Sequence, residues 1–348
     1  MRDVEKNLFL SYSFFNSGYK NFTGENGVGP KAAVFCHNGL GDGINCLVLS
    51  NNLHLNGWQV DTYQNVIGPL QAWFPHLLVQ SYPSMEALPK ILGQYDYFFV
   101  VQNDTDPFVL QLITEGKRRF PERIKVIYLY PSPRIVNEPY YTDCLTEFNR
   151  PIAENLRLLC EKVLHLPKTT KSNGFIPPID LTYRKYLKRI AIHPTSARES
   201  RNWPKHQFVK LALHLKELGY EPVFLPGGKK EKEAWSDVEA LGFSVLTFET
   251  LDLLARFLYE SGYLIGNDSG LGHLASALHI PTLTLCRGKR LSQLWRPSFY
   301  HGVVVTPSSL VPNIKGFRFR DIYWKHCITV GMVKRAFKKL LQIDQKSR

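Results

Sequence analysis

A short segment in the second half of the chain combines an acid, a hydroxyl and several glycines. The apolar run that starts at Leu264 breaks into Gly-Asn-Asp-Ser-Gly-Leu-Gly-His and then resumes with helical periodicity. Free N–H groups at a helix N-terminus bind phosphate, glycine permits close approach, and Asp or Ser caps the helix. The segment predicts a phosphate site formed by Asp268, Ser269, Gly270 and Leu271. A turn followed by a capped helix explains the same residues.

A second segment places hydroxyls and cations after another apolar run. In residues 192–208, IHPTSARESRNWPKHQF, the hydroxyls of Thr195 and Ser196 precede Arg198 and Arg201. Hydroxyl and guanidinium groups together suit the oxygens of a phosphate. The alternative is a solvated loop whose arginines have no ligand.

A third segment, FLPGGKKEKE, ends an apolar run in two glycines and carries Glu231 a few residues later. An acid after a strand of this kind often binds a ribose hydroxyl. An exposed acid in the first turn of a helix is the alternative explanation.

A similar corner occurs in the first half, where HNGLGDGINCL places Asp42 among Gly39, Gly41 and Gly43. A carboxylate that faces a cleft can act as a general base if it is ionised near neutral pH. A helix N-terminus favours the ionised form. The alternative is that Asp42 only caps its helix.

Alternating strand and helix patterns position these corners. Short apolar runs rich in β-branched and aromatic residues predict buried parallel strands, and amphipathic stretches between them predict helices. In the first half the expected strands are 32–37, 59–65, 95–102 and 124–131, with a helix over 44–57. In the second half the expected strands are 189–194, 221–228, 244–248, 263–270 and 282–286, with helices over 204–219 and 251–262.

The pattern stops and restarts around residues 168–180, a stretch rich in Pro, Gly, Ser and Thr. We therefore expect an N-terminal extension (1–30), a first domain (31–175), a second domain (181–330) and a basic C-terminal helix (331–348). Two placements of that helix stay open: it packs on its own domain, or it crosses back to the first domain. A chain of 348 residues is long enough for two domains.

Composition narrows the class of partner. The net charge of +13 predicts attraction to polyanions. The six cysteines form no C-x-x-C pair, which argues against a zinc site and fits reduced thiols in the cytosol. The N-terminus is a poor signal peptide, and no apolar stretch is long enough to span a membrane.

The order of the three corners in the second half resembles that in the bacterial heptosyltransferases of lipopolysaccharide core synthesis, glycosyltransferase family 9. The motifs are T-S-x-R-x-x-R-x-W-P, then L-P-G-G-x-x-E, then N-D-S-G-L-x-H-L-A. The resemblance covers most of residues 32–290 and is weaker in the first half. It implies an α/β fold of GT-B type, with two facing Rossmann-like, doubly wound domains and a central cleft. It also implies that residues 31–175 form the acceptor-binding domain and residues 181–330 the nucleotide-sugar-binding domain.

The resemblance also implies roles. A heptose would move from ADP-heptose to a hydroxyl of an inner-core acceptor with inversion, and Asp42 would be the general base. No cofactor or metal is expected. The donor-binding residues would be Thr195, Ser196, Arg198, Arg201, Glu231, Asp268, Ser269, Gly270, Leu271 and His273, although His273 has packing as an alternative. The acceptor-side loop would contain Gly39, Gly41 and Gly43.

Other functions stay open. The donor or the acceptor could differ, with a polysaccharide or protein as acceptor, and a nucleotide-sugar epimerase or a catalytically silent partner could share this architecture. The long N-terminal extension and the residues GINCLVL after Asp42 depart from the family pattern. Nucleic-acid binding is disfavoured because the basic residues are dispersed and no known binding motif occurs. No G-x-G-x-x-G follows a strand, which argues against a dinucleotide-dependent oxidoreductase.

Basic residues gather towards the C-terminus, in segments 285–295, 315–325 and 333–341. They fit a lipid-linked, phosphorylated acceptor at an anionic membrane surface. The expected location is cytoplasmic, with peripheral attachment to the inner membrane as an option. The amphipathic C-terminal helix would suit such attachment unless its apolar face is packed.

Overall fold

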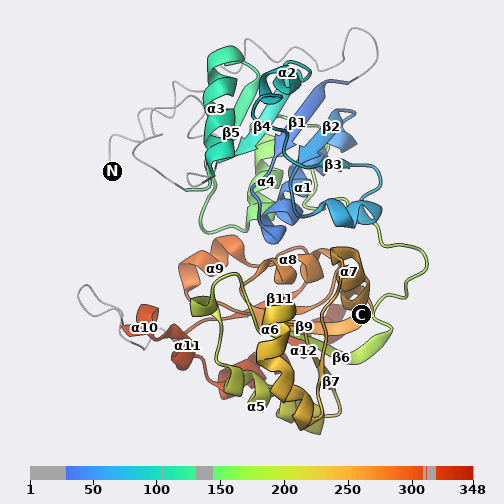
Figure 1. The fold of residues 1–348 in the computed structure, drawn as a ribbon, viewed down its shortest axis with the longest axis vertical. Helices are drawn as coiled ribbons and strands as arrows, with labels where there is room; N and C mark the ends of the chain where they lie inside the picture. Colours follow the sequence, from blue (N-terminus) through green and yellow to red (C-terminus); the bar gives the residue numbers. More distant parts are fainter. Residues whose placement is uncertain (1–28, 103–105, 131–143, 309–310, 312–318, 348) are drawn as a thin grey trace.

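The computed structural model describes residues 29–102, 106–130, 144–308, 311 and 319–347. These residues form two α/β domains, one above the other in Figure 1, joined by an irregular connection. Residues 1–28 of the expected extension and residues 315–318 of the basic segment 315–325 lie outside the described residues.

The first domain holds a five-stranded parallel sheet with the order β3-β2-β1-β4-β5. Its strands are β1 (Lys31–Phe35), β2 (Gln59–Tyr63), β3 (Leu78–Gln80), β4 (Tyr97–Val101) and β5 (Ile124–Ile127). Its helices are α1 (Leu40–Leu55), α2 (Leu88–Leu92), α3 (Pro107–Arg119) and α4 (Ile152–Lys162), with a 3-10 turn η3 (Gly68–Trp73). The strand order reverses between β1 and β4, as in doubly wound folds.

The second domain holds a six-stranded parallel sheet with the order β11-β10-β9-β6-β7-β8. Its strands are β6 (Tyr186–His193), β7 (Glu221–Phe224), β8 (Ser244–Val245), β9 (Ser261–Asn267), β10 (Thr282–Leu285) and β11 (Gly302–Val305). Here the order reverses between β6 and β9. Both domains therefore have Rossmann-like topology, and the predicted fold class is confirmed.

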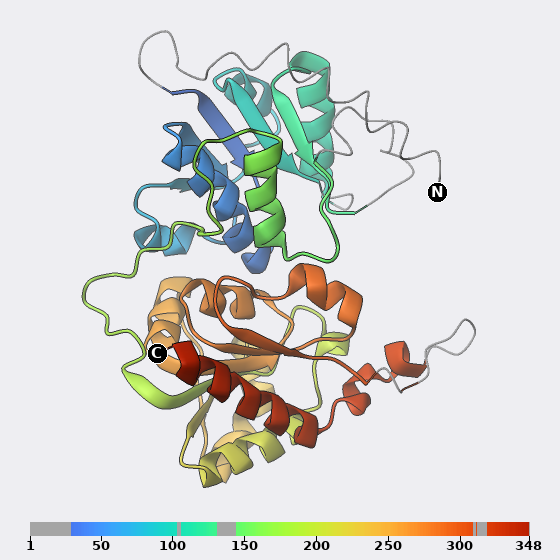
Figure 2. The same ribbon diagram turned by 180° about the vertical axis from the view of Figure 1, so that it is seen from behind.

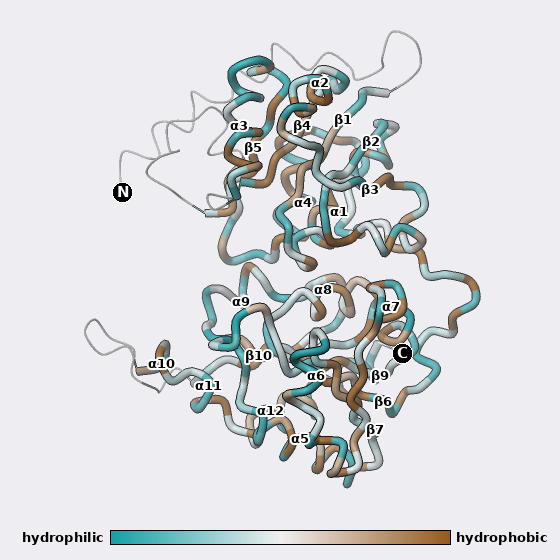
Figure 3. Tube along the Cα trace, viewed as in Figure 1, coloured by the Kyte–Doolittle hydropathy of each residue, from teal (hydrophilic) through white to brown (hydrophobic). Residues whose placement is uncertain are grey.

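Helices cover both faces of each sheet (Figures 1 and 2). The helices of the second domain are α5 (Lys205–Glu217), α6 (Lys229–Trp235), α7 (Leu251–Tyr259), α8 (Gly270–Ala277), α9 (Lys289–Trp295), α10 (Phe319–Ile322), α11 (Trp324–Cys327) and α12 (Val330–Ser347), with 3-10 turns η4 (Glu199–Arg201) and η5 (Ser236–Leu241). Because both faces are covered, central strands such as β4 and β9 are almost fully buried, and hydrophobic residues recur along them in Figure 3.

The C-terminal helix α12 packs on its own domain, against α5, β10 and β11. Val333, Phe337 and Leu340 are buried there. Its other end is held by Asp344, whose carboxylate accepts hydrogen bonds from Arg184 and Tyr263. The option that this helix crosses back to the first domain is wrong, because its apolar face is already used.

The connection between the domains runs along α1 before it leaves the first domain. The side-chain amides of Asn52 and Asn56 each donate to and accept from the backbone of this segment, at Thr170 and Lys168 respectively. These four bonds replace the backbone pairing that an irregular segment lacks. The predicted linker 168–180 is thus irregular but tied down over its first part.

A third apolar cluster lies where the domains meet. It combines buried residues of the first domain, among them Ile44 and Trp73, with residues of the second, among them Leu258 and Leu274. The indole N–H of Trp73 also donates to Asp252 at 2.8 Å. The two domains therefore share a buried core and do not simply face each other across solvent.

Candidate active site

A cavity of about 680 Å³ opens between the two domains. It lies beyond the carboxyl ends of β1, β6 and β9, next to the strands where each sheet order reverses. Ligands of open α/β sheets bind at this position. Every predicted site residue except Gly43 lines this cavity, whereas Gly43 is buried against Gln64 and Ile67.

The two glycine corners meet at the edge of the cavity. A Cβ atom added to Gly270 would lie 2.7 Å from Cβ of Leu40 and 2.9 Å from the amide nitrogen of Gly41. A Cβ atom added to Gly41 would lie 2.7 Å from Cδ2 of His273. Gly41 and Gly270 therefore let the N-terminal turns of α1 and α8 touch, which brings both helix N-termini to one site.

Asp42 is the third residue of α1, and the residue that caps this helix is Gly39. The interpretation of Asp42 as the helix cap is therefore wrong. Burial raises the pKa of the Asp42 carboxyl, and His37 opposes this shift with Nδ1 at 3.9 Å from Oδ2. The result is a partly exposed carboxylate with increased basicity at the first domain's side of the cavity.

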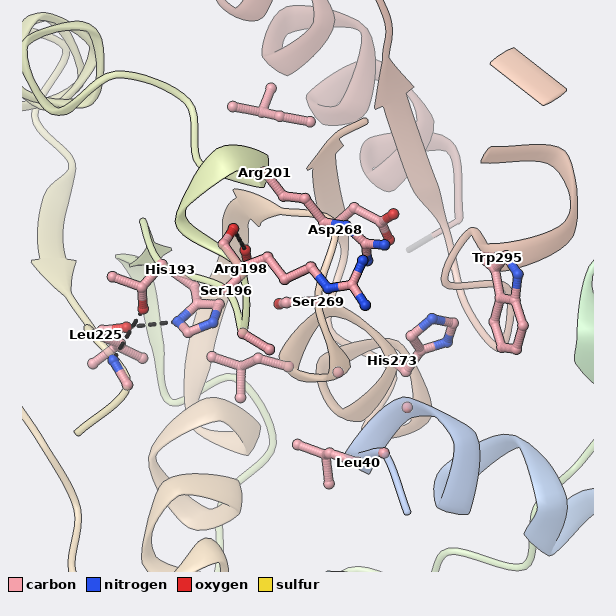
Figure 4. A pocket seen from close by; sticks show the side chains of 18 of the residues that line it. Leu40, His193, Ser196, Arg198, Arg201, Leu225, Asp268, Ser269, His273 and Trp295 are labelled. Carbon is pink, nitrogen blue, oxygen red and sulfur yellow. Dashed lines mark hydrogen bonds between the residues drawn. The ribbon is translucent and has the colours of Figure 1, made fainter. Parts of the chain in front are cut away.

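The loop after β6 supplies two arginines. Arg198 and Arg201 are exposed, line the cavity and form no ion pair within the described part of the chain. Figure 4 shows both side chains extending towards Ser269 and Asp268. The two guanidinium groups are available to an anionic ligand.

The two hydroxyls of the same loop, which were expected to bind phosphate, form hydrogen bonds within the protein. Thr195 Oγ1 accepts from the amide of Gly227 at 3.0 Å, and Ser196 Oγ lies 2.7 Å from Oδ1 of Asn202. The first bond fixes the loops after β6 and β7 relative to each other, and the second lies within the loop after β6. Both residues line the cavity, but in this structure their hydroxyls bind protein groups.

The N-terminus of α8 completes the anion-binding features. Ser269 is its capping residue, and its buried Oγ has no hydrogen-bond partner among the residues that the structure describes. The first N–H groups of a helix also lack intrahelical partners. Beside them, burial raises the pKa of the Asp268 carboxyl and the nearby Arg201 opposes that shift. An unpaired hydroxyl, free amides and two arginines together fit a diphosphate.

Glu231 lies in the first turn of α6, and its carboxylate accepts from the Gly228 amide at 2.9 Å. It also lines the cavity. The position of Glu231 is therefore compatible both with an acid in the first turn of a helix and with an acid that binds a ribose hydroxyl. The neighbouring wall is apolar and consists of side chains that the sequence did not single out, namely Leu225, Leu246, Phe248 and Leu254.

His273 lies at the back of the cavity and links the domains. Its Nδ1 is 3.1 Å from Nδ2 of Asn45, whose amide also donates to the Gly41 carbonyl at 2.7 Å. Since that nitrogen of Asn45 is a donor, Nδ1 is the acceptor. Burial lowers the pKa of His273 to about 4, so the ring is neutral at pH 7. Packing between domains is the role that these contacts support.

Several aromatic residues of the cavity were missed in the sequence. Trp295 at the end of α9 donates from its indole N–H to the hydroxyl of Tyr130, 2.6 Å away in the first domain. Trp324 and His193 also line the cavity. Tyr130 and His193 had a signal, because each lies near the end of a predicted strand; Trp295 and Trp324 reach the cavity only because segments distant in sequence converge.

Two further findings concern the described residues only. They contain no group of three or more His, Cys, Asp or Glu side chains placed to hold a metal ion. None of their helices has both the length and the apolar character needed to cross a bilayer.

Comparison with known proteins finds a family match in the second half of the chain. Residues 150–297 match the model of glycosyltransferase family 9 (heptosyltransferase). Lipopolysaccharide heptosyltransferase 1 of Campylobacter coli is 33% identical over 111 residues, which cover 29% of this chain and 32% of that protein. The same enzyme of Salmonella typhimurium is 31% identical over 99 residues, 31% of its length. The matched part of this chain thus spans about a third of these curated relatives.

Solved structures agree over nearly the whole chain. A glycosyl transferase family 9 protein of Veillonella parvula has a TM-score of 0.64 at 19% identity, covering 90% of this chain and 97% of that one. E. coli heptosyltransferase WaaC with ADP has a TM-score of 0.62 at 16% identity, covering 89% and 99%. These likenesses show a shared fold. Residues 150–297 thus match glycosyltransferase family 9 (heptosyltransferase), and the two domains of this chain share the GT-B fold of these solved proteins.

Proposed function

We propose that this protein is an inverting glycosyltransferase that moves a heptose from ADP-heptose to a hydroxyl of a lipopolysaccharide inner-core acceptor. The observation that carries this proposal is that one cavity is lined by Asp42 of the first domain and by the two arginines and the α8 N-terminus of the second. The curated relatives are named as lipopolysaccharide heptosyltransferases, and one structural neighbour was solved with ADP.

The donor would lie along the second domain. Its diphosphate would contact Arg198, Arg201, the Ser269 hydroxyl and the first amides of α8. Its nucleoside would lie against the apolar wall of Leu225, Leu246 and Phe248, with Glu231 as the acceptor for a ribose hydroxyl. This orientation follows from the chemistry of the two ends of the cavity, since one end is cationic and the other apolar.

In the transfer step, the Asp42 carboxylate takes the proton of the acceptor hydroxyl. The acceptor oxygen then forms a bond to the anomeric carbon from the side opposite the diphosphate. The bond from that carbon to the diphosphate oxygen breaks, and the electron pair leaves with ADP. The two arginines and the helix N-terminus stabilise the charge that develops on the leaving group. The raised pKa of Asp42 makes it a better base than an ordinary aspartate.

The acceptor would be lipid-linked and phosphorylated, presented at the cytoplasmic face of an anionic membrane. Because the apolar side of α12 is packed against its own domain, this helix would contribute only its basic residues to such a contact. We therefore expect weak, salt-sensitive attachment without insertion. Flotation with vesicles of phosphatidylglycerol tests it: binding that persists at high salt would contradict the electrostatic mechanism.

Nucleotide binding is the first experiment, measured by calorimetry for ADP, UDP and GDP with magnesium and with a chelator. We expect selective ADP binding that does not need metal, is lost in Arg201→Ala and is kept in Asp42→Asn. A preference for UDP or GDP would retain the chemistry and replace the donor. Absence of binding to all three would overturn the transferase proposal.

One observation favours a second candidate, a nucleotide-sugar epimerase. Such an enzyme needs acid and base groups on two sides of a sugar, and Asp268 places a second carboxylate of raised pKa in the cavity. Incubation with the nucleotide sugar alone separates the two. Conversion of the sugar to an epimer in the absence of any acceptor would support the epimerase.

A further inference from the structure

A second cavity, of about 590 Å³, lies at another part of the domain junction. Residues of the first domain, the connection and the second domain all contribute to it, including α4, the edge strand β11 and α12. In Figure 2, α12 crosses the front of the second domain below α4. None of the residues assigned to the donor or to Asp42 chemistry lines this cavity.

Three cations converge on it: Lys171 of the connection, Arg296 after α9 and Lys339 of α12. Within the described residues none of the three forms an ion pair or a side-chain hydrogen bond. The carboxylate that lines the cavity, Glu154, already pairs with Arg157 at 2.8 Å. Three unpaired cations at one hollow repel each other unless an anion lies between them.

Hydroxyl groups line the same hollow. Thr282 and Thr284 of β10 are buried, and in the described part of the chain the buried Oγ of Ser298 has no hydrogen-bond partner. A buried hydroxyl without a partner is uncommon in proteins. Gly302 on the adjacent strand leaves the space open, because a Cβ atom there would lie 2.8 Å from Thr282 Oγ1. Hydroxyl donors beside unpaired cations are the combination that binds phosphate oxygens.

We infer that this hollow is a second anion-binding site, separate from the donor cavity, which takes a compact ligand bearing one or two phosphate groups. Because Arg157 already neutralises Glu154, the three cations leave a net charge of about +3, which attracts the charge of about −1.5 to −2 of a phosphate monoester near pH 7. Lys and Arg together with hydroxyl donors suit such a group.

The location gives the site a consequence for the donor cavity. One short segment separates the two hollows, with Trp295 on the donor side and Arg296 and Ser298 on the other. A bound anion would also connect Lys171 of the connection to Lys339 of the second domain. Occupancy therefore stabilises the present arrangement of the domains, whether or not the proposed transferase activity is correct.

The test is calorimetric titration of the full-length protein with inorganic pyrophosphate at physiological salt. We expect two sites in the wild type. The double variant Arg296→Gln/Lys339→Gln should lose one of them, with binding weakened by about tenfold or more since charge-assisted hydrogen bonds are removed. Arg201→Ala should lose the other. The matched control Arg335→Gln/Lys338→Gln removes two exposed charges of α12 that do not line the hollow and should keep both sites.

All four changed positions are exposed, so the variants should fold, and circular dichroism checks this. A wild type with one site that only Arg201→Ala removes would overturn the inference. Equal loss in the control variant would overturn it as well, because it would indicate attraction by overall charge. Adding saturating ADP should block only the donor site, so failure of the donor proposal leaves the second site measurable.

Discussion

At the scale of single residues, burial sets the proton affinity of the groups on either side of the domain junction. It raises the pKa of Asp42 and lowers that of His273 to about 4. The first change makes a carboxylate more basic, and the second keeps an imidazole neutral as a hydrogen-bond acceptor for Asn45. Each change leads to a measurable result.

Replacing Asp42 by Asn should lower kcat by about 10²–10⁴-fold, because the amide cannot accept the proton of the acceptor hydroxyl. In the wild type, kcat/KM should fall as pH drops through the raised pKa of Asp42, since the carboxylate is then protonated. The measurement is ADP release with donor and acceptor present, with ADP affinity as the control for folding. Near-normal turnover of the variant would assign the base to another group.

His273 should make folding less stable in acid. Its pKa is about 4 in the folded protein, compared with an ordinary value of 6.5. Between pH 4 and pH 6.5 this histidine therefore binds more protons in the unfolded chain than in the folded one. The free energy of unfolding should therefore decrease as pH falls from 6.5 to 4, by about 3 kcal/mol at most. Urea titrations across this range measure it, and His273→Gln should reduce the slope. A His273 resonance that titrates near pH 6.5 would contradict the expected burial.

At the scale of elements, two helix N-termini touch through glycine. The contact between α1 and α8 depends on Gly41 and Gly270, which lie far apart in sequence. Helix packing at this distance leaves no room for a side chain, and the same closeness directs both N-termini towards the cavity. The glycines therefore have a packing role in addition to any close approach of a phosphate.

Gly270→Ala should separate these helices and destabilise the protein by about 1–3 kcal/mol, the usual cost of overpacking. The new Cβ would meet the backbone of Gly41 at 2.9 Å, which cannot rotate away. Thermal unfolding measures the loss, and nucleotide affinity should fall with it. Gly288→Ala is the matched control, because its Cβ would have no neighbour within 4 Å. Equal effects of both substitutions would show that the helix contact is not the cause.

At the scale of the whole molecule, the apolar cluster between the domains couples their stabilities. Trp73 is fully buried in it, although it belongs to the first domain, and it contacts Tyr259 of the second at a ring-centroid distance of 5.7 Å. A shared core of this kind favours cooperative unfolding of both domains.

Calorimetry of the wild type should therefore show one unfolding transition. Trp73→Ala should cost about 3–5 kcal/mol, the range for truncating a buried aromatic residue, and should split the transition in two. Trp58→Ala serves as the comparison, because it truncates a tryptophan within the first domain's own core. This variant should lower the midpoint of thermal unfolding without splitting the transition. Two transitions in the wild type would contradict the coupling.

The sequence by itself determined the two-domain α/β class and the position of the chemical residues along the chain. Apolar runs that end in Gly, Asp, Ser or Arg identify the carboxyl ends of parallel strands, and those ends meet at one edge of a sheet. For this reason Asp42, Arg201 and Ser269 could be selected without coordinates. All three line the same cavity.

Only the tertiary structure decided how the two halves meet. Local propensity does not specify that α1 starts at Leu40. The contact between Gly41 and Gly270 and the hydrogen bond from Trp295 to Tyr130 join residues that are far apart in sequence. The placement of α12 is decided in the same way, because an amphipathic pattern shows that one face is buried but not against which surface. Local patterns follow from neighbouring residues, whereas these contacts follow from packing two folded domains together.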